Sequence, residues 1–208
     1  MNGSNNSTTF TDSSSFALSC SAQGNAKLST AQVKYGSAAG YFDGSSYVRV
    51  PSSYMLVYGA NNFTVECWIY PTSWAGYPNI WSQRYSGSVT IRITSSGYLQ
   101  FFYGEGLGGI TGSSQVALNA WSHIALTREG NTFKLWLNGS LVGTSSASSV
   151  DLSGSNAYVG ASQTQSEPFY GYIDELRVTN YLARYTSSFT PPSAPCLLYT
   201  SDAADDLL

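Results

Sequence analysis

The chain has 208 residues, of which 10% are charged, and a formal net charge of −3. This length allows one domain with a single sizeable core. Three of the twelve acidic residues lie in the last seven positions, so the rest of the chain balances nine acids against nine bases, which excludes a basic nucleic-acid-binding surface. No apolar run approaches the roughly 20 residues of a membrane-spanning helix, so we expect no membrane insertion.

Alternation of apolar and polar residues predicts β-strands along most of the chain, with turn residues about every ten positions. Asn138-Gly139 suits a type I′ turn, which joins two of these strands in a tight hairpin. No helix longer than one turn is expected, and a single turn is expected at 182–185. The predicted strands, in chain order, span residues 63–70, 89–94, 99–103, 123–128, 132–137, 140–143, 157–161 and 170–178. This spacing is typical of an all-β protein in which two antiparallel sheets pack as a β-sandwich.

Four segments also carry a family resemblance: YFDGSSYVRVP (41–51), FTVECWIYPTS (63–73), WSHIALTREGNTFKLWLNG (121–139) and GYIDELRVTNYLARYTSSFTPP (171–192). In this order and spacing they resemble the laminin G-like, concanavalin A-like lectin/glucanase superfamily, and in particular its subgroup in bacterial surface proteins and bacteriophage structural proteins. The resemblance implies a jelly-roll β-sandwich. It implies no single activity, because the fold hosts sugar binders, hydrolases, adhesion modules and spacers.

The resemblance divides the chain into a β-sandwich over residues 10–190 with two unusual ends. Residues 1–9 resemble the part of the pattern that follows an apolar first strand, so we interpret them as a truncated segment and expect an incompletely paired sheet edge beside the strand 172–178. Residues 191–195 read as a Pro-rich exit. Residues 196–208 break abruptly from the preceding composition, and we interpret them as the translation of a sequencing adapter, an artefact tail.

Asp174 is the candidate for a metal site. It is in phase with Tyr172, Leu176 and Val178, which predicts an inner or semi-buried position for its carboxylate. Burial of a carboxylate is costly unless hydrogen bonds or a cation stabilise it. The resemblance implies a structural calcium ion as one solution, with Asp43 as a second ligand. The alternative, which we favour because no dense cluster of ligands is visible, is hydrogen bonding from the backbone N–H groups of a turn.

Residues suited to catalysis are scarce. Glycoside hydrolases need two carboxylates about 5–10 Å apart, and the neighbouring acids Asp174 and Glu175 are predicted to point to opposite faces of a strand. The single histidine, His123, has no nucleophile motif beside it, so we interpret it as structural. The GxGxxG spacing at 104–109 follows a strand but opens no helix, which indicates a loop rather than a dinucleotide site. We therefore predict that the protein is not an enzyme.

Aromatic residues provide the candidate ligand site. Sugars stack their C–H faces on exposed tryptophan and tyrosine rings, while amides and arginines bind their hydroxyl groups. In one loop rich in aromatics we predict stacking on Trp74 and Tyr77, and hydroxyl contacts from Gln83 and Arg84. Trp136 lies on the polar face of its strand and is a secondary candidate. The alternative for each ring is packing in the core or at its rim.

Together these features favour a non-catalytic carbohydrate-binding or adhesion module of a larger protein, located on a virion or at an extracellular surface. Its expected partners are a glycan or cell-surface polysaccharide and neighbouring domains of a longer chain. No cofactor is expected apart from the calcium ion considered above. A purely structural spacer is the main alternative, and a remnant of a glycanase is the third hypothesis.

Overall fold

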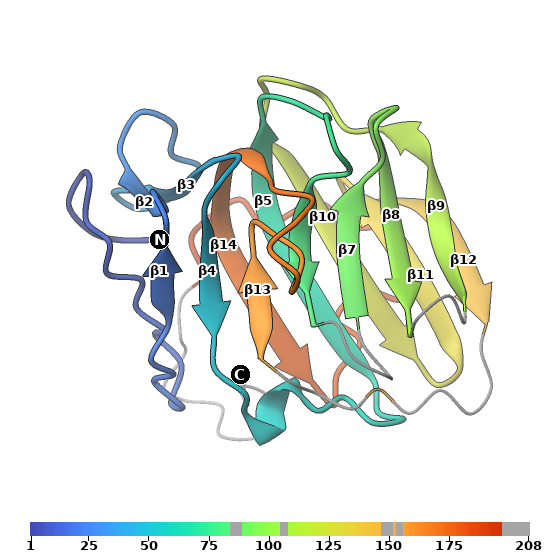
Figure 1. The fold of residues 1–208 in the computed structure, drawn as a ribbon. Helices are drawn as coiled ribbons and strands as arrows, with labels where there is room; N and C mark the ends of the chain where they lie inside the picture. The colour runs from blue at the N-terminus through green and yellow to red at the C-terminus, as the bar shows by residue number, and fades with distance from the viewer. Residues whose placement is uncertain (84–88, 105–107, 147–151, 153–155, 197–208) are drawn as a thin grey trace.

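The computed structural model describes residues 1–83, 89–104, 108–146, 152 and 156–196. Within them, fourteen β-strands form two seven-stranded sheets that pack face to face (Figure 1). The predicted all-β antiparallel sandwich is confirmed. No helix in these residues is long and apolar enough to cross a membrane.

The two sheets, called A and B below, are each built from strands that are distant in sequence. Sheet A has the order β1 (Ser21–Gln23), β4 (Tyr47–Val50), β13 (Ala157–Val159), β6 (Asn79–Ser82), β7 (Val89–Ile93), β8 (Tyr98–Tyr103) and β9 (Gly108–Gln115). Sheet B has the order β12 (Ser140–Ser146), β11 (Thr132–Leu137), β10 (Ser122–Glu129), β5 (Phe63–Pro71), β14 (Tyr170–Asn180), β3 (Ala39–Asp43) and β2 (Lys27–Ser29). A single 3-10 turn, η1 (Tyr54–Leu56), completes the described elements.

The core lies between the sheets and follows from the alternation along the strands. In β5, the side chains of Val65, Cys67 and Ile69 are buried in this core, so the residues between them point to the outer face of sheet B. Phe133 of β11 stacks on Tyr103 of β8 with 5.3 Å between ring centroids, which joins the two sheets across the core.

Strand β14 lies inside sheet B, where it pairs with β5 on one side and β3 on the other. The incompletely paired edge predicted beside residues 172–178 is wrong for Tyr172 and Ile173, which pair with β3 as well as with β5. The pairing with β3 covers residues 170–173, so among the described strands Arg177 and Val178 pair with β5 alone, and for that part of the strand the prediction holds.

A β-bulge interrupts β14 and changes which residues face outward. Glu175 has a positive φ of 51°, and the register with β5 shifts between Asp174 and Arg177. Asp174 therefore shares the outer face with Tyr172, whereas Leu176 packs against the core. The predicted burial of Asp174 is correct, but the predicted common phase of Asp174 and Leu176 is wrong. The carboxylate of Asp174 is buried on the outer face of sheet B, where Met1, Lys34 and Tyr35 contact it.

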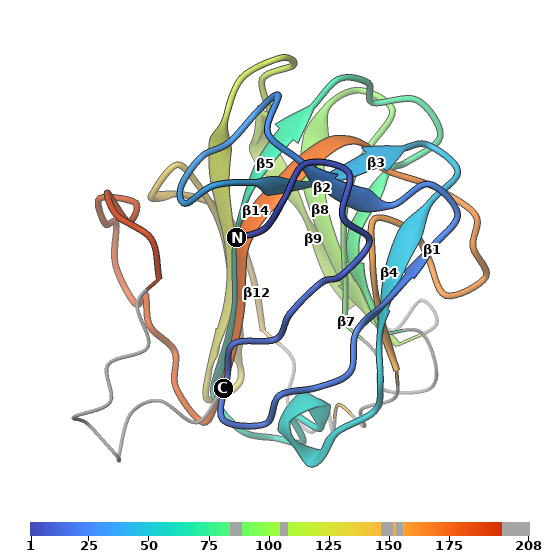
Figure 2. The same cartoon turned by 90° about the vertical axis from the view of Figure 1, so that its left-hand side faces the viewer.

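The segment 181–196 runs along the outer side of sheet B, away from sheet A (Figure 2). The predicted helical turn at 182–185 is wrong, because this segment is irregular. Hydroxyl groups on the sheet bind its carbonyl oxygens: Thr64 donates to Leu182 and Thr127 donates to Tyr185. These bonds attach the segment to the sheet, and we call it the C-terminal strap.

Candidate functional site

A row of aromatic side chains crosses the open part of the outer face of sheet B. Tyr172 of β14 lies directly between Tyr41 of β3 and Tyr70 of β5, and Trp121, immediately before β10, contacts Tyr70. Lys27 of β2 lies opposite Tyr41 and extends the row by one position. All five side chains are half-buried. We call the four rings the aromatic row.

The rings of the aromatic row contact one another in sequence. The centroids are 5.2 Å apart for Tyr41 and Tyr172, 5.8 Å for Tyr172 and Tyr70, and 5.6 Å for Tyr70 and Trp121. The rings are tilted or edge-on, which is a favourable geometry for aromatic pairs. Because neighbouring strands lie about 4.8 Å apart, the row spans roughly 14 Å. It forms a corrugated apolar surface on rigid strands.

A depression of about 360 Å³ lies at the β2 end of this row. Its walls combine two rings of the row with polar groups, and they are formed by Asn5, Asn6, Lys27, Ser29, Thr30, Ala31, Tyr41 and Tyr172. Rings that stack, with amides, hydroxyls and a cation beside them, are the residue types that bind sugars.

Sequence reasoning missed the aromatic row, although alternation offered a partial signal. Gly40, Phe42, Ile69 and Ile173 are buried, so their neighbours Tyr41, Tyr70 and Tyr172 must face outward. That each tyrosine lies beside the next depends on the register of three strands that are far apart in sequence, which the local pattern does not reveal.

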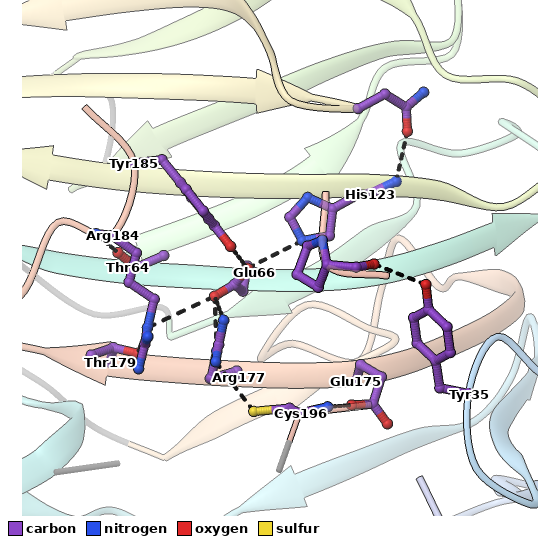
Figure 3. A network of polar contacts seen from close by, with 12 residues as sticks. Tyr35, Thr64, Glu66, His123, Glu175, Arg177, Thr179, Arg184, Tyr185 and Cys196 are labelled. Carbon is purple, nitrogen blue, oxygen red and sulfur yellow. Dashed lines mark hydrogen bonds and ion pairs between the residues drawn. The ribbon is translucent and has the colours of Figure 1, made fainter. Parts of the chain in front are cut away.

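The other half of the outer face carries a buried polar network beneath the C-terminal strap (Figure 3). Glu66 of β5 is only 2% exposed. Arg177 donates two hydrogen bonds to one of its oxygens, at 2.8 and 2.6 Å. The hydroxyl of Tyr185, in the strap, donates to the other oxygen at 2.7 Å, and Nε2 of His123 lies 3.1 Å from it. The strap is therefore anchored to the sheet through a buried carboxylate.

The partners of Glu66 determine its protonation. Burial would raise its pKa, but the hydrogen bond with His123, the charge of Arg177 and the hydroxyl of Tyr185 outweigh burial and lower the pKa to about 2. Glu66 is therefore ionised at neutral pH. His123 is buried, as expected of a structural histidine, and its Nε2 is engaged by Glu66. The two groups form a brace under the strap rather than an open acid–base pair.

The structure favours the hydrogen-bonded interpretation of Asp174. Its carboxylate, fully buried, accepts backbone N–H groups from Lys34 at 3.0 Å, Tyr35 at 3.1 Å and Glu175 at 2.9 Å. It also accepts a hydrogen bond from the amino group of Met1. These donors, which include the positively charged amino group of Met1, compensate the burial of the carboxylate charge.

Asp43 does not join Asp174 in a shared site. It pairs with Tyr170, four residues along β14, which puts the two acids roughly 13 Å apart. Its oxygens accept hydrogen bonds from Asn25 and Ser45; burial opposes their effect, but the pKa of Asp43 still falls to about 2. The two residues do not fit a common calcium ion. In the part of the chain that the structure describes, no three His, Cys, Asp or Glu residues are grouped as a metal site.

Two of the predicted ligand-binding residues are inaccessible. Gln83 is 1% exposed, and its side-chain amide donates to the carbonyl of Leu56 in the interior. Trp136 does point to the outer face, but it is also 1% exposed, because Phe189 of the strap packs on its ring. Its indole N–H donates to Thr127. Both predictions are corrected: neither side chain can touch a ligand in this arrangement.

In the described remainder of the predicted loop, Tyr77 offers an open ring. Trp74 packs against the core and covers the β7–β8 turn, where its ring lies so close to Gly97 that a side chain there would clash. Tyr77 is 40% exposed and stacks with the guanidinium of Arg92, 4.7 Å from the ring centroid. Arg84 lies outside the described residues. Trp74, Tyr77 and Gln83, the loop candidates that the structure describes, do not assemble into a platform comparable to the aromatic row.

Comparisons with known proteins identify the family. Residues 42–184 match the family model of the concanavalin A-like lectin/glucanases superfamily. The chain belongs to this superfamily. A comparison with curated proteins finds no match.

Solved structures share the concanavalin A-like fold. Domain 4 of an extracellular arabinanase from Geobacillus stearothermophilus, in complex with arabinotriose, has a TM-score of 0.68 and 17% identity, covering 84% of this chain and 88% of that one. Botulinum neurotoxin type C, whose cell entry depends on two ganglioside molecules, has a TM-score of 0.64 and 16% identity, covering 86% and 47%. Domains LG4-5 of the mouse laminin α1 chain have a TM-score of 0.55 and 17% identity, covering 77% and 47%. These similarities show the fold alone.

The interactions of Glu66 predict that acid lowers the unfolding free energy of this lectin/glucanase-superfamily domain. Because the folded-state pKa of Glu66 is below its ordinary value of 4.5, the folded state binds fewer protons than the unfolded state, and acid favours unfolding. Glu66→Gln should lower the unfolding free energy by about 3 kcal/mol at pH 6 to 7. The difference from wild type should shrink as the pH falls from about 4.5 towards 2, as measured by urea unfolding.

Glu129→Gln is the matched control, because Glu129 is half exposed and pairs with Lys134 at the surface. Its loss should change the unfolding free energy by less than about 1 kcal/mol. A Glu66→Gln deficit that stays constant from pH 7 to pH 2 would contradict an ionised, braced carboxylate.

The hydrogen bonds of Asp174 lead to a second prediction. Asp174→Ala leaves the backbone N–H groups of Lys34 and Tyr35 without their acceptor, so it should lower the unfolding free energy by about 1–3 kcal/mol. Treatment with EGTA should leave the wild-type melting temperature unchanged. A melting temperature that falls with EGTA and recovers with added calcium would show that the calcium hypothesis holds instead.

Proposed function

We propose that this domain is a non-catalytic carbohydrate-binding or adhesion module, and that it binds a glycan along the aromatic row. The observation that carries the proposal is the register that sets Tyr41, Tyr172 and Tyr70 side by side on an open sheet face, with Trp121 at the end. Half-buried rings are held by their neighbours and still offer a face or edge to the axial C–H groups of sugars. No loop has to close for this surface to form.

The shape of the surface supports weak binding of a chain. A row of roughly 14 Å accommodates a few consecutive sugar units on rings that the strands hold in place. Because the row is shallow, only a few rings stack and little surface is buried. We therefore expect dissociation constants of about 10 μM to 1 mM.

A binding role also agrees with the state of the buried acids. Glu66 is saturated by Arg177, Tyr185 and His123 beneath the strap, and Asp174 by backbone donors. Neither carboxylate is available to act as an acid or a nucleophile on a bound sugar. The arabinanase domain in complex with arabinotriose and the neurotoxin that interacts with gangliosides make glycan binding plausible for the same fold.

The wider context belongs to the same proposal. We infer a module of a larger extracellular, cell-surface or virion protein, of the subgroup found in bacterial surface and bacteriophage proteins. The domain itself would cover residues 10–190, with 1–9 as a truncated segment, 191–195 as the exit and 196–208 as an artefact tail. Cys196 contacts Arg177 and Glu175, while the rest of that tail lies outside the described residues.

Removal of one ring from the row tests the function. Tyr172→Ala should weaken binding to the best ligand from a broad glycan array about tenfold or more, because Tyr172 is the central ring and contacts both neighbours. Binding is measured by calorimetric titration and stability by thermal melting, so that lost binding is separated from lost folding.

Tyr158→Ala provides the control. Tyr158 is a half-buried tyrosine on the outer face of sheet A, where it tilts against Tyr47 at 5.8 Å, so it matches Tyr172 in type and burial. This variant should bind as wild type does. Equal loss in both variants, or no wild-type signal on bacterial, algal and animal glycans, would favour the structural-spacer alternative.

A further inference from the structure

We propose that the depression at the β2 end of the aromatic row is a subsite for an acidic sugar, and that Lys27 binds its carboxylate. The inference rests on the proposed glycan-binding function and names its substrate class: a glycan that contains uronic or sialic acid units. The evidence for it is the position of Lys27 and the contacts that the nearby acids, Asp43 and Asp174, already make.

Lys27 faces the depression without an ion-pair partner. It lines the cavity wall beside Tyr41, and its Nζ lies 5.9 Å from the centroid of that ring. Among the described residues, Lys27 makes no ion pair. Lys134, in contrast, pairs with Glu129 at 3.2 Å. Lys27 is thus a half-buried cation, held against an aromatic wall, that no acid of the described chain neutralises.

The two carboxylates nearest along the strands are already engaged. Asp43, two positions from Tyr41, accepts hydrogen bonds from Asn25 and Ser45. Asp174, two positions from Tyr172, is saturated by backbone N–H groups and the amino group of Met1. Neither acid forms an ion pair with Lys27, and neither lines the depression, where Lys27 is the charged residue among the eight described lining residues.

The other walls suit the rest of a sugar unit. Tyr41 and Tyr172 offer rings for stacking, and Asn5, Asn6 and Thr30 offer amide and hydroxyl groups at exposed positions. Burial and the proximity of Tyr41 raise the pKa of the Tyr172 phenol, so it stays a neutral donor that does not repel an anion. A volume of about 360 Å³ lies at the small end of ligand sites, which suits one or two sugar units.

A purely structural role for Lys27 gives a different expectation. If the lysine only covered the Tyr41 ring, it would stabilise the fold slightly through a cation–π contact and would not distinguish acidic from neutral sugars. Charge selectivity of binding therefore separates the two roles.

The experiment compares matched probes. Trigalacturonic acid, oligo-alginate, hyaluronan tetrasaccharide and sialyllactose are each paired with a neutral counterpart, either the methyl ester or the asialo sugar, and titrated into the full chain by calorimetry at 20 and 150 mM salt. At least one acidic form should bind about tenfold tighter than its neutral counterpart at low salt. The difference in affinity between the acidic and the neutral form should decrease at 150 mM salt, because salt screens the attraction between charges.

Variants assign this preference to the subsite. Lys27→Gln should abolish the preference for the acidic form while weak binding of the neutral form remains, and Lys27→Arg should retain the preference. Arg49→Gln removes an exposed cation from the outer face of sheet A and should leave the preference unchanged. Melting temperatures near wild type confirm that the variants are folded.

The outcomes distinguish this inference from the proposed function. Equal binding of acidic and neutral forms, or a preference that survives Lys27→Gln, overturns the acidic subsite and leaves the glycan-binding function intact. No binding of any probe, acidic or neutral, and no signal on the glycan array overturns both.

Discussion

The pairing of β14 with β3 on one side and β5 on the other is the constraint on which the outer face of sheet B depends. One register places Tyr172 beside Tyr41 and Tyr70, and after the bulge a shifted register sets Arg177 to Asn180 against β5. A slip by one residue would turn each of these side chains to the other face, because the period of a strand is two. The buried core residues of β5 and β14 prevent this slip.

The bulge at Glu175 divides this face into two parts with different roles. Before the bulge, the aromatic row lies open on rigid strands, where binding requires little ordering of the protein. Beyond it, Arg177 meets Glu66, and the C-terminal strap covers the pair with Tyr185. Burial removes the water that stabilises each charge of such a pair. Hydrogen bonds to the remaining polar atoms of the pair offset this cost. Both oxygens of Glu66 have such partners, so the pair holds the strap while leaving the aromatic row uncovered.

Much of the fold could be predicted because its determinants are local. The alternation from 123 to 137 and the Asn138-Gly139 turn identified β10, β11 and the hairpin to β12, and strand spacing indicated the sandwich. The site was less predictable because its determinants are distant in sequence. Alternation correctly turned Trp136 outward, but only the folded strap reveals that Phe189 covers it. Likewise, no local pattern shows that Gln83 reaches Leu56 or that three tyrosines from three strands form a row.

The most direct test of the glycan-binding face is chemical-shift mapping of the isotope-labelled domain during titration with an array-selected oligosaccharide. The account predicts that the indole N–H of Trp121 and the backbone amides around Tyr41, Tyr70 and Tyr172 shift together and saturably. Amides on the outer face of sheet A and the buried indole of Trp136 should stay unmoved. Saturable shifts confined to the loop around Trp74 and Tyr77, or to sheet A, would contradict it.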